Sequence, residues 1–179
     1  ALDIAMICPL HGPVLKEDLG HYIDKYNIWS SYGVESEGVF IAYASVYGNT
    51  RKAADMLASK LADKGVHVTV SDLARDDWAE CLEDAFRYGK LVLAAPTYNA
   101  DVFPAMKEFI NHLTERNYQN RTIGIIENGS WAPMAAKVMK GMFEKSKNIT
   151  FAENTVTVRS AVNAANEAQI EALAEELKG

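Results

Sequence analysis

The fold is decided by the stretch VFIAYASVYGNT at residues 39–50, in which an apolar run leads directly into a loop of small and polar residues. The run at 39–44 has the length and the continuous hydrophobicity of a strand that is buried on both faces of a sheet. A helical pattern follows the loop at once. A buried strand, a tight polar turn and a helix together are typical of the first half of a βαβ unit.

Outward from this stretch, strand-like and helix-like patterns alternate to the end of the chain. Further apolar runs lie at 66–70, 91–95, 123–126 and 156–158. Between and after these runs, apolar residues recur at helical spacing: Trp78, Cys81, Leu82, Ala85 and Phe86; Met106, Phe109, Ile110 and Leu113; Ala135, Val138, Met139, Met142 and Phe143; Ile170, Leu173, Ala174 and Leu177. Five strands and five helices in alternation predict right-handed crossovers and an α/β fold, a parallel sheet with helices on both faces.

Composition narrows the function classes. The net charge of −6 argues against nucleic acid or an anionic membrane surface as a partner. No apolar run approaches the ~20 residues that span a bilayer. The only cysteines, Cys8 and Cys81, have no metal-binding or disulfide spacing. We therefore expect a cytoplasmic protein kept under reducing conditions.

Residues 1–36 do not continue the alternation of strand-like and helix-like patterns seen in the rest of the chain. An apolar run at 4–8 predicts a short strand, and Leu15, Leu19, Tyr22, Ile23 and Tyr26 lie on one face of a helix-like segment. One strand and one helix cannot bury that face alone, so we expect it to pack on the domain, on a second copy or on a missing part. The chain opens with Ala1-Leu2-Asp3 and no initiator Met. A segment cut from a longer polypeptide is expected, with a processed natural N-terminus as the alternative.

The loop at 45–50 has the chemistry of a phosphate site. In a doubly wound sheet, ligands bind outside the carboxyl ends of the strands. Backbone N–H groups at the start of a helix converge on an anion there, and the hydroxyls of Ser45 and Thr50 add donors. The loop lacks the lysine of a nucleoside-triphosphate site and the GxGxxG of a dinucleotide site. An ordinary helix start capped by Asn49 or Thr50 explains the same residues about equally well.

Two other loops reach the same edge of the predicted sheet. Residues 95–101 read APTYNAD and residues 127–132 read ENGSWA. Each places an aromatic side chain, Tyr98 or Trp131, among small and amide residues. Aromatic walls with amide and backbone groups along one edge suit a planar ring. Acidic Asp101 and Glu127 are expected near that ring, where they would add negative charge.

These three motifs together resemble the flavodoxin family, and most closely the flavodoxin domain of flavodiiron proteins. The resemblance implies a five-stranded parallel sheet of order 2-1-3-4-5 over residues 37–179 and flavin mononucleotide (FMN) as the cofactor. Many flavodoxins carry a glycine where Asn99-Ala100 stands here. The cofactor-binding residues that the resemblance implies are Ser45, Val46, Tyr47, Gly48, Asn49, Thr50, Pro96, Thr97, Tyr98, Asn99, Asn128, Gly129, Ser130 and Trp131.

The N-terminal segment carries a second resemblance. CPLHGP at residues 8–13 is similar to the end of the metallo-β-lactamase-like domain that precedes the flavodoxin domain in flavodiiron proteins. Residues 1–36 are therefore expected to be the C-terminal remnant of such a domain plus a linker. The resemblance makes His11 an iron ligand of the longer protein. The other ligands are missing from this sequence, and we expect His11 to bind no iron here.

The function that the resemblance implies is electron transfer. A rubredoxin-like protein would supply electrons, and a diiron centre in the parent protein would receive them and reduce O₂ or NO. We expect the longer protein to be a homo-oligomer, and this fragment to hold no complete catalytic site. A flavodoxin-like NAD(P)H or quinone oxidoreductase and a flavin-free docking module are the alternatives. A phosphoacceptor receiver domain is disfavoured because strand three ends in Ala95-Pro96 without an aspartate.

Overall fold

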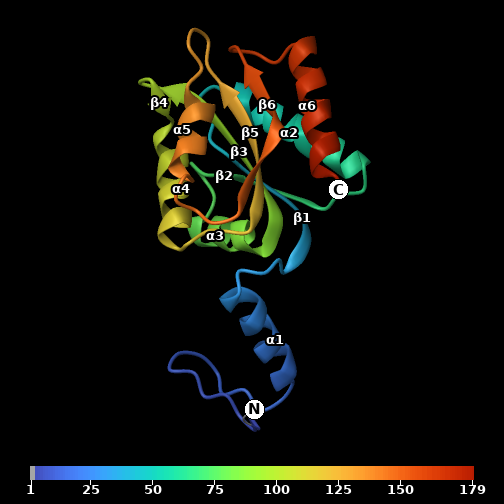
Figure 1. The fold of residues 1–179 in the computed structure, drawn as a ribbon, viewed down its shortest axis with the longest axis vertical. Coiled ribbons are helices and arrows are strands. Elements are labelled where there is room, and N and C mark those ends of the chain that lie inside the picture. Colours follow the sequence, from blue (N-terminus) through green and yellow to red (C-terminus); the bar gives the residue numbers. More distant parts are fainter. Residues whose placement is uncertain (1–2) are drawn as a thin grey trace.

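The computed structural model describes residues 3–179; Ala1 and Leu2, with which the expected N-terminal segment begins, lie outside the described residues. A twisted sheet forms the centre of the molecule (Figure 1). Its parallel strands are β1 (Ser36–Tyr43), β2 (Val68–Asp72), β3 (Tyr88–Tyr98), β5 (Arg121–Asn128) and β6 (Ile149–Val158). They lie in the order β2-β1-β3-β5-β6, which is 2-1-3-4-5 when only parallel strands are numbered. The predicted α/β fold and strand order are confirmed.

Helices cover both faces of the sheet, as the sequence predicts. On one face lie α2 (Asn49–Asp63) and α6 (Ala164–Leu177), and on the other lie α3 (Trp78–Arg87), α4 (Pro104–Glu115) and α5 (Ala135–Met142) (Figure 1). Successive strand residues enter opposite layers: Phe40 and Ala42 join the core under α3, α4 and α5, whereas Ile41 joins the core under α2 and α6. Because both faces are buried, the strands are apolar without alternation.

A short antiparallel hairpin at the carboxyl edge of the sheet was not predicted. β3 runs on to Tyr98, three residues past the predicted run, and pairs with β4 (Asp101–Val102). The two residues between them, Asn99 and Ala100, have φ of 51° and 56°. Positive φ at both central residues is the signature of a type I′ turn, whose twist matches that of the flanking strands. Asparagine tolerates this conformation, but alanine is strained in it.

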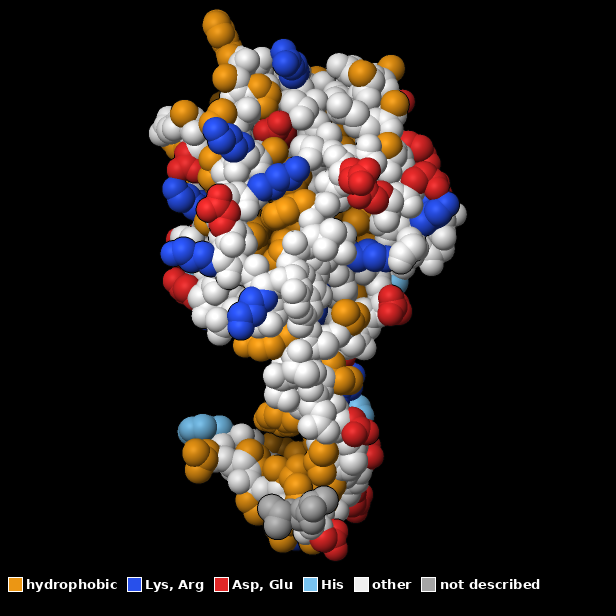
Figure 2. Space-filling model, in the orientation of Figure 1, with side chains coloured by type: hydrophobic (Ala, Val, Ile, Leu, Met, Phe, Trp, Pro, Cys, Tyr) orange, Lys and Arg blue, Asp and Glu red, His pale blue; other side chains and the backbone are white. Residues whose placement is uncertain are grey.

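The N-terminal segment stands apart from this body. The predicted helix is present as α1 (Leu19–Ser30), and none of its residues is buried. The predicted strand at 4–8 is wrong: a single β-bridge between Ile7 and Leu15 forms there instead. Leu15, predicted on the apolar face of the helix, lies before its first residue. Figure 1 shows α1 projecting away from the sheet, and Figure 2 shows apolar side chains gathered in the hollow between α1 and the preceding loop.

Buried polar contacts fix the junction between α1 and the body. The guanidinium of Arg121, only 3% exposed, donates hydrogen bonds to the carbonyls of Tyr32 (2.8 Å) and Gly33 (2.9 Å). It also donates to the carbonyl of Phe86 at the end of α3 (2.6 Å). On the other side of the junction, Glu35 accepts hydrogen bonds from Lys25 and from the indole N–H of Trp29 on α1. Residues 32–35 are therefore tied to both regions.

Among residues 3–179, no helix is long and apolar enough to cross a bilayer. The two cysteines are free thiols, Cys8 exposed and Cys81 buried.

Candidate cofactor-binding site

A cavity of about 430 Å³ opens at the carboxyl edge of the sheet, where the loops after β1, β3 and β5 meet. This is the edge at which doubly wound folds bind ligands, and the volume lies within the usual range for small-molecule sites. The lining residues are Ser45, Val46, Tyr47, Asn49, Thr50, Pro96, Thr97, Tyr98, Phe103, Asn128, Gly129, Ser130 and Ser160.

The structure thus brings together the three loops that the sequence singles out. All of the predicted contact residues line the cavity except Gly48, Asn99 and Trp131. Gly48 lies at the start of α2, Asn99 in the hairpin turn, and Trp131 in the loop after β5, where it is 94% exposed. Phe103 and Ser160 line the cavity without having been predicted. Which of these residues touch a ligand stays a prediction.

One end of the cavity presents uncommitted donors. The N-cap of α2 is Gly48, with φ of 86°, and no side chain caps the helix. The alternative explanation of this loop, an ordinary helix start capped by Asn49 or Thr50, is therefore wrong. Thr50 is 2% exposed and lines the cavity, and its hydroxyl has no hydrogen-bond partner among residues 3–179. The first N–H groups of a helix have no partner within it, so this end of the cavity suits an anion.

Thr97 fixes a donor in the middle of the cavity wall. Its Oγ1 accepts hydrogen bonds from the backbone N–H groups of Met134 (2.9 Å) and Ala135 (3.2 Å) at the start of α5. A hydroxyl has two lone pairs and one hydrogen, so both acceptor positions of Thr97 are occupied. Its remaining capacity is to donate. Because Thr97 lines the cavity, that donor is available to an acceptor atom of a ligand.

The loop after β5 closes tightly on this wall. A Cβ at Gly129 would lie 3.0 Å from Cα of Pro133 and 3.1 Å from Oγ1 of Thr97, so a side chain there would push the loop away. The amide of Asn128, 8% exposed, is paired with the backbone of Ser160 by two hydrogen bonds of 3.1 Å. These contacts hold the loops after β3, β5 and β6 in one arrangement.

Aromatic side chains border the rest of the opening. Tyr98 packs edge-to-face on Phe103, with ring centroids 5.8 Å apart, and is half exposed. Tyr47 is 92% exposed. These two tyrosines leave an apolar rim open to solvent, and large exposed aromatics of this kind mark ligand or partner contacts.

The two acidic residues expected near the ring, Asp101 and Glu127, are not among the residues that line the cavity. Asp101 does not border the cavity; the Lys107 ammonium and the Val102 N–H hold the pKa of its carboxyl below the ordinary value. The buried carboxylate of Glu127 accepts hydrogen bonds from Ala136 N (3.0 Å) and Thr157 Oγ1 (2.9 Å). Asp101 is thus paired with a cation and Glu127 with neutral donors, and the distance of either carboxylate from a bound ring stays a prediction.

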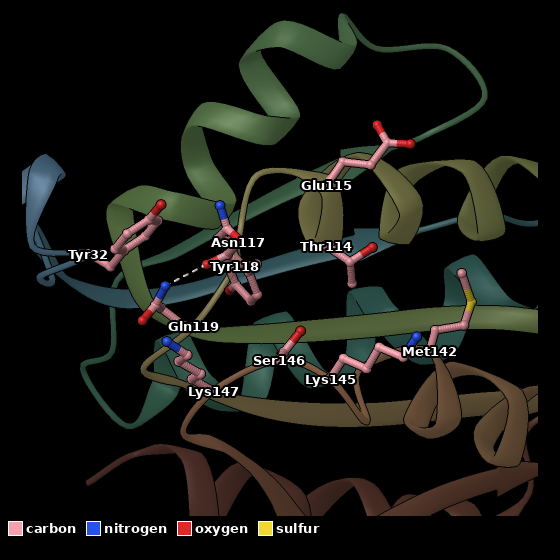
Figure 3. A pocket seen from close by; sticks show the side chains of 10 residues that line it. All are labelled: Tyr32, Thr114, Glu115, Asn117, Tyr118, Gln119, Met142, Lys145, Ser146 and Lys147. Carbon is pink, nitrogen blue, oxygen red and sulfur yellow. Dashed lines mark hydrogen bonds between the residues drawn. The ribbon is translucent and has the colours of Figure 1, made fainter.

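A second cavity, of about 490 Å³, lies at the opposite edge of the sheet (Figure 3). Its side chains come from the end of α4, from the turn before β5 and from the connection between α5 and β6, with Tyr32 at its border. The side chain of Gln119 is already engaged with the carbonyl of Asn117 (2.9 Å). Because this cavity lies at the amino ends of the strands, it has no role in the site above.

Metal binding has no support in the described part of the chain. No three His, Cys, Asp or Glu side chains of residues 3–179 gather where they could hold a metal ion. His11 lies exposed in the loop before α1.

A parallel sheet of order 2-1-3-4-5, with an uncapped helix start after its first strand and aromatic loops after its third and fourth, defines a flavodoxin-like protein. Comparison with known proteins agrees. A family described as "Flavodoxin domain" matches residues 40–161, so the chain belongs to the flavodoxin domain family. Over nearly its whole length the chain matches the flavodoxin part of flavodiiron proteins. Membership of this family implies flavin binding in general.

Two curated relatives illustrate the match. Coenzyme F420H(2) oxidase of Methanothermobacter marburgensis is 32% identical over 67% of this chain and 29% of its own. Anaerobic nitric oxide reductase flavorubredoxin of Aeromonas hydrophila is 27% identical over 73% of this chain and 26% of its own. The chain thus spans less than a third of the length of either relative.

Solved structures share the fold. Rubredoxin oxygen:oxidoreductase from Desulfovibrio gigas superposes with a TM-score of 0.89 at 20% identity, over 97% of this chain and 43% of that one. A flavodiiron protein of Thermotoga maritima superposes with a TM-score of 0.84 at 21% identity, over 99% of this chain and 44% of that chain. Both matches extend through the N-terminal segment and stop at less than half of the longer chain.

The sequence carried a weak signal for one of the two missed lining residues. Phe103 follows the aromatic loop and precedes a Pro at the start of α4, a place where a side chain turns back toward the strand end. Ser160 is a lone serine after the last strand, and its residue type predicts nothing specific.

Proposed function

We propose that this chain is an FMN-binding electron-transfer domain. In a longer protein it relays electrons from a rubredoxin-like donor to a diiron centre that reduces O₂ or NO. The observation that carries the proposal is the cavity itself. At one end it joins the uncapped start of α2 with Thr50, a residue that is 2% exposed and lines the cavity, and at the other end it presents aromatic and amide groups. An anionic phosphate and a planar ring, linked by a flexible chain, match those two ends.

The residues divide the binding work by position. The N–H groups at the start of α2 and the hydroxyls of Ser45 and Thr50 hold the phosphate. Tyr98 and Trp131 cover the faces of the ring, and the Thr97 hydroxyl donates a hydrogen bond to an acceptor on its edge. When bound, FMN supplies reversible electron transfer in steps of one or two electrons. The side chains orient it, exclude water from one side and leave the other open.

The exposed rim supports a relay role. Tyr47, which lines the cavity, and Trp131, in the loop after β5, are almost fully exposed, and a redox partner that contacts them would come close to the bound ring. The relatives whose names describe an oxidase, a nitric oxide reductase and an oxygen:oxidoreductase are all longer than this chain. We propose that residues 37–179 are the flavin domain and residues 1–36 the end of a preceding metallo-β-lactamase-like domain. We also propose that the longer protein is a homo-oligomer.

Titration with FMN tests the binding part. Flavin fluorescence should be quenched with one site per chain, and Thr50→Val should weaken binding about 10- to 100-fold, because a hydrogen bond to a charged group contributes ~1.5–3 kcal/mol. Thr150→Val, on an exposed residue of β6, is the matched control and should change nothing. Equal binding by both variants, or no binding by the wild type, contradicts the proposal.

Rapid mixing tests the relay part. The FMN-loaded chain should be reduced quickly by reduced rubredoxin and only slowly by NADPH. Rapid bleaching of the flavin by NADPH would favour the oxidoreductase alternative instead.

A further inference from the structure

Ser160 occupies a strained turn beside the cavity. The N–H of Ala161 donates to the carbonyl of Arg159 (3.1 Å), which makes Ser160 the central residue of a three-residue turn. Its φ is +70°, a value that side-chain-bearing residues rarely adopt. A γ-turn with positive φ at its centre is rare and strained. Such strain persists only where neighbouring contacts impose it, and it gathers at ligand sites.

The neighbouring contacts come from the end of β5. Asn128 Nδ2 donates to the carbonyl of Ser160, and the N–H of Ser160 donates to Asn128 Oδ1, both at 3.1 Å. Next to this pair, the N–H of Gly129 donates to the carbonyl of Val158 (3.0 Å). The Asn128 amide is thereby bonded to the turn through both its oxygen and its nitrogen.

The strained turn carries the side chain of Ser160, and this side chain ends in a hydroxyl. Glycine would adopt this φ without strain, so the serine adds a Cβ and a hydroxyl to a position that favours neither. Ser160 lines the cavity, and its hydroxyl has no partner among residues 3–179. The hydroxyl is therefore free to bond a ligand.

Strand order indicates which part of a ligand lies there. The phosphate loop follows β1, whereas Ser160 follows β6, and β3 and β5 lie between these two strands. Ser160 is thus at the far end of the row of loops from Thr50, beside the loops that border the ring.

We propose that Ser160 binds the polar edge of the flavin ring through its hydroxyl, and that Asn128 is a positioning residue that holds Ser160 in the strained turn. This inference rests on the proposed function, because it assigns a ring-contacting residue within the same site. It adds a fourth loop to the three that surround the cofactor.

The test compares FMN with riboflavin, which has the same ring but no phosphate. Ser160→Ala should weaken the binding of both flavins by the same factor, about 3- to 10-fold, as expected for one neutral hydrogen bond. Ser160→Gly should weaken both equally while raising the melting temperature, because it removes the strain with the hydroxyl. Asn117→Gly, which relieves a φ of +57° far from the cavity, should raise the melting temperature and leave flavin binding unchanged.

A double-mutant cycle tests the role of Asn128. If Asn128 acts through Ser160, the losses of flavin affinity in Asn128→Ala and Ser160→Ala should not add. Adding Ser160→Ala to the Asn128→Ala variant should then cost less affinity than Ser160→Ala costs in the wild type. Additive losses would overturn the positioning role.

Three outcomes would contradict the Ser160 contact, its assignment to the ring or the proposed function, and each can be told from the others. Wild-type affinity for both flavins in Ser160→Ala and Ser160→Gly overturns it while the proposed function stands. A loss confined to FMN places Ser160 at the phosphate and overturns the ring assignment. A wild-type chain that binds neither flavin overturns the proposed function, and the inference falls with it.

Discussion

Two regions of this chain carry the same kind of amphipathic helical pattern and fold differently. In residues 36–179 the apolar stripes of five helices are buried against a sheet, whereas none of residues 3–35 is buried. α1 has an apolar face like the others, yet Tyr26 and Trp29 remain more than half exposed. A helical stripe thus predicts a helix and does not predict what covers it. In the body, the sheet buries the apolar helix faces, whereas the N-terminal segment, over residues 3–35, has no element that buries the apolar face of α1.

The largest effect is expected at Arg121, which joins the two regions. Arg121→Met removes a buried guanidinium and leaves the carbonyls of Tyr32, Gly33 and Phe86 without this donor, so it should destabilise the body by about 3–5 kcal/mol. Arg116→Met, on an exposed arginine of the same turn, should change stability by less than ~0.5 kcal/mol. Urea unfolding measures both, and equal midpoints would show that the junction contributes nothing.

Replacing a glycine by alanine should destabilise the protein in the body and leave the stability of the body unchanged in α1. A Cβ at Gly38, where φ is +147°, would lie 2.8 Å from the carbonyl oxygen of His67, so Gly38→Ala should destabilise by about 2 kcal/mol or more. A Cβ at Gly20 in α1 meets nothing within 4 Å. Gly20→Ala should leave the melting temperature of the body unchanged and slightly increase helix content by circular dichroism. A destabilised body in Gly20→Ala would mean that α1 is coupled to it.

A smaller effect of opposite sign is expected in the hairpin. Ala100 has φ of 56°, and glycine adopts that conformation freely. Ala100→Gly should stabilise the body by about 0.5–1 kcal/mol, the alanine strain less the entropy that glycine adds to the unfolded chain. Thermal unfolding measures the shift; a lower melting temperature would argue against the type I′ geometry of the turn.

The smallest effect is expected from removing residues 1–30. The truncation removes the partly exposed contacts of Lys25 and Trp29 with Glu35. It also removes the acceptors of the backbone hydrogen bonds that residues 31–33 donate to the end of α1. The body should keep its cooperative unfolding, with a change below ~1 kcal/mol. A molecule that no longer unfolds in one cooperative step would show that the segment is part of the core.

How far the sequence predicts the structure depends on whether the deciding contacts are local. The strands and helices of the body follow from periodicity because each buries its own stripe. The β3–β4 hairpin was missed because Asn99-Ala100 lacks the glycine that marks a type I′ turn. Asn49 and Thr50 were candidate caps of α2 by residue type, whereas Gly48 holds that position by its backbone.

The site shows the same division. The loops after β1, β3 and β5 were predictable because topology brings the carboxyl ends of these strands together. Ser160 was not predictable, because its place in the cavity depends on two hydrogen bonds between the Asn128 side chain and the Ser160 backbone, which come from the ends of neighbouring strands. The partners of Asp101 and Glu127 were not predictable, because sequence position does not show that Lys107 pairs with Asp101 or that a backbone N–H and a hydroxyl bind Glu127.

The ratio of the dissociation constants for riboflavin and FMN tests the flavin site most directly. If the start of α2 and Thr50 hold a phosphate, the wild-type chain should bind FMN at least about 100-fold more tightly than riboflavin, since several charge-assisted hydrogen bonds are lost without it. Thr50→Val should shrink that ratio by weakening FMN alone. Equal affinity for the two flavins, or a ratio unchanged in Thr50→Val, would contradict a phosphate at this loop.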